Sequence, residues 1–230
     1  MRVFWNNSLF LGAVVTLLAY EAGLLLRRKL RMAICNPLLI AILCVMGALG
    51  VLDVDYEVYN EGGKYISYLL TPATVCLAVP LYRQLSLLKK NMRAVAAGLL
   101  SGVLASLVGV LVLSLLFGLS HEQYVTLLPK SITTAIGMGV SQELGGVTAI
   151  TVAAIILTGV LGNVIAEAVF KVAGIQEPVA RGLALGTASH AIGTAKALEL
   201  GEVEGAMSSL AIAAAGLLTV AAAPVFAGFL

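Results

Sequence analysis

Long stretches without a single charged residue are the feature that most constrains how this chain can fold. Each reaches or approaches the roughly 20 apolar residues that a membrane-spanning helix needs, and charges are costly at the centre of a bilayer. Only 11% of the residues are charged, against about a quarter in a soluble domain. We therefore predict an all-α polytopic membrane protein, a single integral membrane domain over residues 1–230 with about six spanning helices. The six windows are residues 3–20, 32–52, 65–82, 94–121, 144–166 and 205–230.

The charges between these windows predict the topology. The basic run "RRKLR" (27–31) follows the first window, and four basic residues lie within 83–93. Of the five charged residues within 53–64, four are acidic. By the positive-inside rule, residues 27–36 and 83–93 are cytoplasmic, and the N-terminus is outside. Because the basic residues are not gathered on one soluble face, no nucleic-acid partner is predicted.

The chain also contains an internal similarity at an offset of 57 residues. "VAAGLLSGVL" (95–104) and "VAAIILTGVL" (152–161) are identical at seven of ten positions, and the same register places Pro72 on Pro129. Chance similarity between helices rich in Ala, Leu and Gly is the alternative. In the predicted topology the two matching helices run in opposite directions, so the offset predicts an inverted repeat, which underlies many secondary transporters.

Two shorter uncharged windows, 131–142 and 182–195, are rich in Gly, Ser and Thr. They lie in the predicted C-terminal half (118–230, the N-terminal half being 1–117). Such a backbone readily leaves the helix, and its freed polar groups must then be satisfied by protein, water or ligand. We predict two short broken or re-entrant segments that line a binding cavity; close helix packing and complete crossing are the alternatives. The predicted helix breaks are Pro72, Pro129, Gly137, Gly186 and Gly193.

Neither short window contains a carboxylate, whereas hydrogen-bond donors are abundant. Half-helix N-termini would add backbone donors, so a small anion such as a carboxylate is the predicted substrate. His190 could also couple a proton, since histidine titrates near neutral pH. Alternatively, Lys130 extends to the membrane surface and His190 only packs. The residues predicted to bind the substrate are Lys130, Ser131, Thr133, Thr134, Thr187, Ser189, His190 and Thr194.

Other chemistry finds little support in the sequence. The three cysteines have no CxxC motif and no histidine nearby, so no metal, disulfide or cofactor is predicted. Ser131 or Ser189 with His190 superficially suggests a nucleophile and its base. Adjacent residues such as Ser189 and His190 need not face each other, however, and no orienting carboxylate is evident. We therefore predict no catalytic residues and no enzyme.

Several segments together resemble the LrgB/CidB family of antiholin-like membrane proteins, and the resemblance covers nearly the whole chain. One departure is Ala135, where the family often has proline after two threonines. The segments that carry the resemblance are "NPLL" (36–39), "LLTPATVCLAVPLYRQL" (69–85), "LPKSITTAIGMGVSQELGG" (128–146), "ARGLALGTASHAIGTAKALEL" (180–200) and "EGAMSSLA" (204–211).

The resemblance implies two functions in a bacterial cytoplasmic membrane. Bacterial members are described as regulators of murein hydrolase export and autolysis, acting with a small holin-like membrane partner of the LrgA/CidA type. Plastid members fused to that partner are similar to glycolate/glycerate carriers, and some bacterial pairs are linked to pyruvate. We therefore expect transport of small organic anions by a carrier or channel, with an antiholin-like regulatory subunit as the alternative. The expected partners are the anion, the holin-like protein, further copies of this chain and the lipid bilayer.

Overall fold

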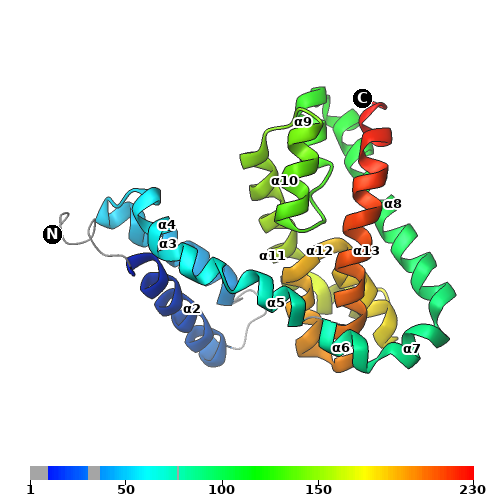
Figure 1. Cartoon of the computed structure of the whole chain (residues 1–230), viewed down its shortest axis with the longest axis horizontal. Coiled ribbons are helices and arrows are strands. Elements are labelled where there is room, and N and C mark those ends of the chain that lie inside the picture. The colour runs from blue at the N-terminus through cyan, green and yellow to red at the C-terminus, as the bar shows by residue number, and fades with distance from the viewer. Residues whose placement is uncertain (1–9, 31–36, 77) are drawn as a thin grey trace. The chain divides into compact units, whose positions relative to one another are not determined.

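The computed structural model describes residues 10–30, 37–76 and 78–230, and within these ranges all regular structure is helical (Figure 1). The described residues divide into two compact units, one up to Cys76 and the other from Ala78 onward. In the first unit, α2 packs against α3 and α4. Its helices are α2 (Leu11–Leu30), α3 (Pro37–Leu52), α4 (Tyr56–Ser67) and α5 (Leu70–Cys76).

The second unit contains the longer helices. Three of them, α8, α11 and α13, are long and apolar enough to cross a membrane. The most extensive contact in this unit joins α12 to α13. Its helices are α6 (Ala78–Arg83), α7 (Leu85–Lys90), α8 (Met92–Phe117), α9 (His121–Leu127), α10 (Thr134–Glu143), α11 (Thr148–Val172), α12 (Pro178–Leu200) and α13 (Glu202–Ala227).

Three of the six predicted spans are therefore confirmed as continuous apolar helices, namely those at 94–121, 144–166 and 205–230. The window 32–52 begins outside the described residues and continues as α3, which has 16 residues. The window 3–20 likewise begins outside them and continues into α2. A total of six spans stays a prediction.

The window 65–82 is divided among short helices. An interruption at Tyr68 and Leu69 separates α4 from α5. Pro72 lies in the first turn of α5, where the missing N–H of proline costs no helical hydrogen bond.

The helix is broken near both short polar windows. A turn that contains Pro129 separates α9 from α10. Within α12, Ser189 (φ −133°, ψ 15°) and His190 (φ 42°, ψ −135°) leave the helical conformation. A positive φ is uncommon for a residue other than glycine and persists only where the surrounding structure holds it. The break at Ser189 and His190 divides α12 into two half-helices.

Three glycines predicted as helix breaks do not lie at breaks. Gly137 is inside α10, and Gly186 and Gly193 lie inside the two half-helices of α12. Their role is close packing: a Cβ on Gly137 would lie 2.5 Å from the Ile155 side chain, and one on Gly186 would lie 2.5 Å from the carbonyl oxygen of Ser208. Of the predicted break residues, Pro129 lies in the turn between α9 and α10. The three glycines lie in the correct windows but inside helices.

The helices α8 and α11 run in opposite directions in the second unit (Figure 1). The C-terminal end of α8 lies beside α9. The start of α11 lies beside the same helix, since the N–H of Val147 donates to the Thr126 hydroxyl at 2.8 Å. The repeat itself remains a prediction.

Candidate functional site

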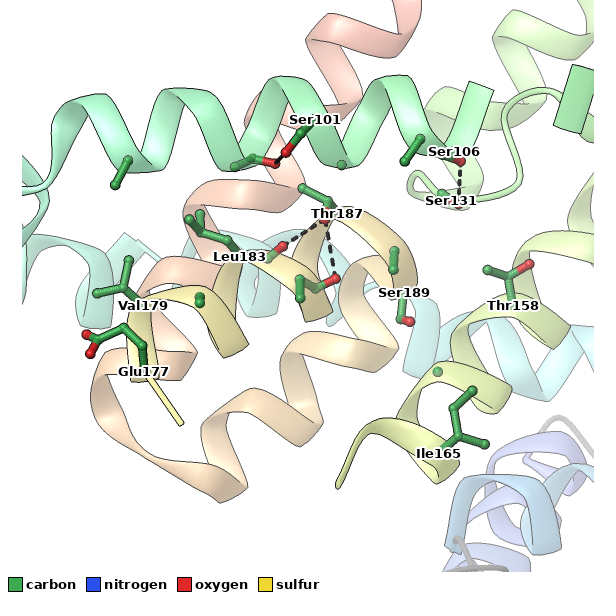
Figure 2. A pocket seen from close by; sticks show the side chains of 18 of the residues that line it. Ser101, Ser106, Ser131, Thr158, Ile165, Glu177, Val179, Leu183, Thr187 and Ser189 are labelled. Atoms are coloured by element: carbon green, nitrogen blue, oxygen red, sulfur yellow. Dashed lines mark hydrogen bonds between the residues drawn. The ribbon is translucent and has the colours of Figure 1, made fainter. Parts of the chain in front are cut away.

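A cavity of about 960 Å³ lies in the second unit (Figure 2). Its walls come from α8, from the turn between α9 and α10, from α11 and from the first half of α12. The cavity thus brings together residues from both short polar windows. Its polar lining residues are Asn91, Ser101, Ser106, Lys130, Ser131, Thr158, Glu177, Thr187 and Ser189.

The wall contributed by α8 consists of small side chains. A helical spacing of three or four residues places them on one face, and their small volume leaves the cavity open. A larger residue in place of Gly102 would clash with α12, since a Cβ at this position would lie 2.7 Å from the Thr187 hydroxyl. The residues of this wall are Ala94, Gly98, Ser101, Gly102, Ala105 and Ser106.

Three hydrogen-bonded side chains form one end of the cavity. The Lys130 ammonium donates to the Ser131 hydroxyl oxygen at 2.9 Å. The Ser106 hydroxyl donates to the same oxygen at 2.9 Å (Figure 2). A hydroxyl oxygen has two acceptor positions. Ser131 therefore accepts at both, and its own proton is left to donate to another group.

The other lining hydroxyls divide into two groups. Ser101 and Thr187 donate to carbonyl oxygens of their own helices: Ser101 to Gly98 at 3.1 Å, and Thr187 to Leu183 at 2.8 Å (Figure 2). In the described part of the chain, the hydroxyls of Thr158 and Ser189 have no hydrogen-bond partner. Ser189 is only 2% exposed, and it lies at the break in α12. Ser131, Ser189 and Thr158 thus offer unused hydroxyl protons.

Four of the eight predicted substrate-binding residues do not line the cavity. Thr133 and Thr134 lie at the start of α10. The Thr194 hydroxyl donates to the His190 carbonyl at 3.0 Å and is 2.7 Å from the Ser208 hydroxyl. The four that do line it are Lys130, Ser131, Thr187 and Ser189.

His190 joins α12 to α11. Its Nε2 lies 2.9 Å from the carbonyl oxygen of Ile155, and because a carbonyl only accepts, Nε2 carries the proton. The ring lies so close to α11 that a Cβ on Gly159 would be 2.8 Å from it. The hydrogen bond therefore ties the break in α12 to α11.

The sequence analysis did not predict several of the lining residues, although the internal repeat pointed to four of them. Ser101 and Thr158 are separated by the repeat offset of 57 residues, and so are Ala105 and Gly162; all four line the cavity. A repeat applied position by position would have found this hydroxyl pair. Ser106 belongs to no comparable motif, since its part in the site depends on the fold of the turn before α10.

The two charged lining residues lie at different levels of the cavity. The exposed Glu177 lies where α12 begins, Asn91 lies where α8 begins, and Lys130 lies at the level of Ser106. At about 1.5 Å per residue, Ser106 lies about 22 Å along α8 from Asn91. The cavity therefore extends from the start of α8 to beyond its middle.

A large cluster of buried apolar residues lies beyond Ser106 and Lys130, at the end of the cavity. Its members include Leu107, Leu128 and Ile132, which adjoin the polar end in sequence, and Tyr124, which is fully buried. The Tyr124 hydroxyl donates to the Phe226 carbonyl oxygen at 2.9 Å, which joins α9 to α13. The cavity thus ends at an apolar cluster beyond the middle of α8.

The site offers little to a cofactor or a metal. Within residues 10–30, 37–76 and 78–230, no three His, Cys, Asp or Glu side chains are grouped as metal ligands. Lys130, Ser131, Thr158 and Ser189 together present donors to the cavity. Such an arrangement can bind an acceptor-rich anion.

Comparison with known proteins gives a consistent result. The model of the LrgB-like family matches residues 16–229. The antiholin-like protein LrgB of Bacillus mycoides (strain KBAB4) is 38% identical over 222 residues, which cover 96% of each chain. The proteins of that name from Bacillus cereus (strain B4264) and Bacillus anthracis (strain CDC 684 / NRRL 3495) are 37% identical with the same coverage. No solved structure matches the chain.

Proposed function

The chain belongs to the LrgB-like family of membrane proteins, and we propose that it is a secondary carrier for small organic monoanions such as glycolate, glycerate or pyruvate. The observation that carries this proposal is the polar end of the cavity, where Lys130, Ser106 and Ser131 are joined by hydrogen bonds. In this proposal the substrate carboxylate binds there.

The hydrogen-bonding pattern favours an anion. The two acceptor positions of Ser131 are occupied, so it can only donate to a ligand, and Lys130 has further N–H donors. A single cation at membrane depth is costly unless an opposite charge lies beside it. In the described part of the chain no carboxylate is paired with Lys130. One carboxylate group from a substrate would supply both the charge and the acceptors.

The break in α12 supports the same ligand from the opposite wall. The half-helix after His190 begins inside the protein, where its first N–H groups carry a partial positive charge. The Ser189 hydroxyl lies at this point and lines the cavity. Broken helices that direct their N-termini at an anionic substrate are a recurrent device of secondary transporters.

The apolar end of the cavity favours a carrier over a channel. A channel needs a continuous path, whereas this cavity ends at the apolar cluster around Tyr124. The residue pairs Ser101–Thr158 and Ala105–Gly162 fit the predicted inverted repeat, whose two halves would exchange the open side. With residues 83–93 on the cytoplasmic side, as the charge distribution predicts, the Asn91 end of the cavity would face the cytoplasm and the N-terminus would be outside.

The second candidate is an antiholin-like regulatory subunit, and the names of the relatives favour it. In that role the chain would act with a small holin-like membrane protein and need not transport anything. The two candidates are compatible if disturbed organic-acid transport alters lysis indirectly.

Reconstitution in liposomes tests the proposal. Purified protein, with and without the holin-like partner, should take up labelled glycolate or pyruvate in a saturable manner. A regulatory subunit without transport activity would give no uptake in either case, and its phenotype in cells would not depend on Lys130.

A further inference from the structure

A second cavity, of about 650 Å³, lies where α11 ends and α12 begins. It shares no lining residue with the first cavity. Two cations, Lys171 and Arg181, line it together with the aromatic ring of Phe170. These residues have no part in the proposed carrier site.

The guanidinium group of Arg181 is held in a fixed position. Its Nε donates to the Ile175 carbonyl oxygen at 2.9 Å, and its central carbon lies 5.7 Å from the centre of the buried Phe170 ring. A planar guanidinium fixed at Nε and against a ring keeps its terminal N–H groups ready for a bidentate ligand. No carboxylate among the described residues is paired with Arg181.

The net charge of this cavity favours an anion. Its lining contains one carboxylate, Glu167, which is ion-paired with Lys196. The Lys196 side chain is only 11% exposed, so this pair is held in place. Lys196 also pairs with Glu199 at 3.4 Å, outside the lining, and so compensates Glu167 only in part. The lining itself holds two cations, Lys171 and Arg181, against this one carboxylate, so its charge stays positive.

The length and composition of α11 lead us to expect a membrane surface at the level of this cavity. The apolar span α11 ends at Val172, next to Lys171. Val169 and Val172 have exposed side chains, 46% and 91%, as expected of residues that contact acyl chains. The phosphate groups of lipids lie immediately outside the hydrocarbon core, and basic pockets beside membrane helices bind anionic headgroups.

From this geometry we propose that the second cavity binds the phosphodiester headgroup of an anionic lipid. Arg181 would contact two phosphate oxygens through its terminal N–H groups, and Lys171 would supply the second positive charge. The proposal does not depend on the transported substrate.

Native mass spectrometry of the detergent-solubilised full chain tests it, with phosphatidylglycerol and phosphatidylcholine as probes. The wild-type protein should retain phosphatidylglycerol in preference to phosphatidylcholine. The Arg181→Gln/Lys171→Gln variant should bind phosphatidylglycerol about tenfold more weakly, as expected when charge-assisted hydrogen bonds are lost. The matched control Arg83→Gln/Lys89→Gln removes two exposed cations from α6 and α7 and should bind like the wild type.

Equal loss in the control variant would show general electrostatic attraction and overturn the proposal, as would full retention by the Arg181/Lys171 variant. Millimolar inorganic phosphate should not displace the lipid. If phosphate displaces it, the cavity is a site for free anions and the lipid assignment is wrong. If the double variant does not fold, Arg181→Lys decides, because it keeps the charge but loses the bidentate contact: weaker phosphatidylglycerol binding supports the proposal, and unchanged binding contradicts it.

Discussion

The hydroxyl oxygens of Ser106 and Ser131 lie 2.9 Å apart although 25 residues separate them in the chain. This contact joins the middle of α8 to the turn between α9 and α10. Together with the bond from Lys130, it fixes the Ser131 hydroxyl as a donor to any ligand in the cavity. The proposed carrier site depends on this arrangement.

We predict that Ser106→Ala raises the KM for glycolate about threefold to tenfold, the effect of one lost hydrogen bond. Without Ser106, the Ser131 proton is no longer directed at the ligand. Ser101→Ala is the matched control on the same helix, because the Ser101 hydroxyl donates to Gly98 and is not needed for binding. Initial rates of uptake into liposomes measure both. A larger effect of Ser101→Ala would contradict the assignment.

Gly102→Ala should impair transport and lower the thermal stability of the protein. The new methyl group would lie 2.7 Å from the Thr187 hydroxyl and force α8 away from α12. Gly109→Ala on the same helix has nothing within 4 Å and should leave both properties unchanged or slightly improved, since alanine favours helices. Thermal unfolding in detergent and glycolate uptake give the two readouts. The prediction fails if both variants behave alike.

The cavity should be accessible from one side of the membrane. In a variant whose three native cysteines are replaced by alanine, Ala94→Cys on the cavity wall should react with an impermeant maleimide from one side. Leu107→Cys, in the apolar cluster and 1% exposed in the wild type, should not react from either side. Labelling of intact cells and of inverted vesicles shows from which side each cysteine reacts. According to the predicted topology, Ala94→Cys should react from the cytoplasmic side. Rapid reaction of Leu107→Cys would indicate a continuous pore.

The variant His190→Gln tests whether His190 couples a proton to transport or only holds the structure together. The bond from His190 to the Ile155 carbonyl, together with its place outside the cavity lining, favours the structural role. We therefore expect the free energy of unfolding to fall by about 1–3 kcal/mol, the cost of a disturbed buried hydrogen bond. The pH profile of the remaining uptake should be unchanged. If the variant loses its pH dependence while remaining stable, His190 couples a proton.

The sequence was sufficient to predict the apolar spans of the second unit, because a span is recognised from the length of a segment without charged residues. It also placed the polar breaks in the right windows. It did not identify the residues at the break in α12. Gly186 and Gly193 were the obvious candidates, but both allow close packing inside the half-helices, and the chain leaves the helix at Ser189 and His190.

Composition likewise indicated a donor-rich site but not its members. Thr187 was expected to bind the substrate because it is a hydroxyl residue in a polar window, yet its proton is used within α12. Ser106 lies in an ordinary apolar helix and enters the site because the turn before α10 lies beside it. Which hydroxyls are free depends on tertiary contacts, and no local pattern reveals them.

The most direct test of the account is uptake of labelled glycolate into liposomes by the wild-type protein and by Lys130→Gln, each with and without the holin-like partner. Lys89→Gln is the charge-matched control, since Lys89 is exposed and lies outside the cavity. We predict saturable uptake by the wild type and by Lys89→Gln, and a reduction of at least about tenfold in Lys130→Gln, because a charge-assisted contact is lost. Absence of wild-type uptake under both conditions, or full uptake by Lys130→Gln, would contradict the proposed carrier.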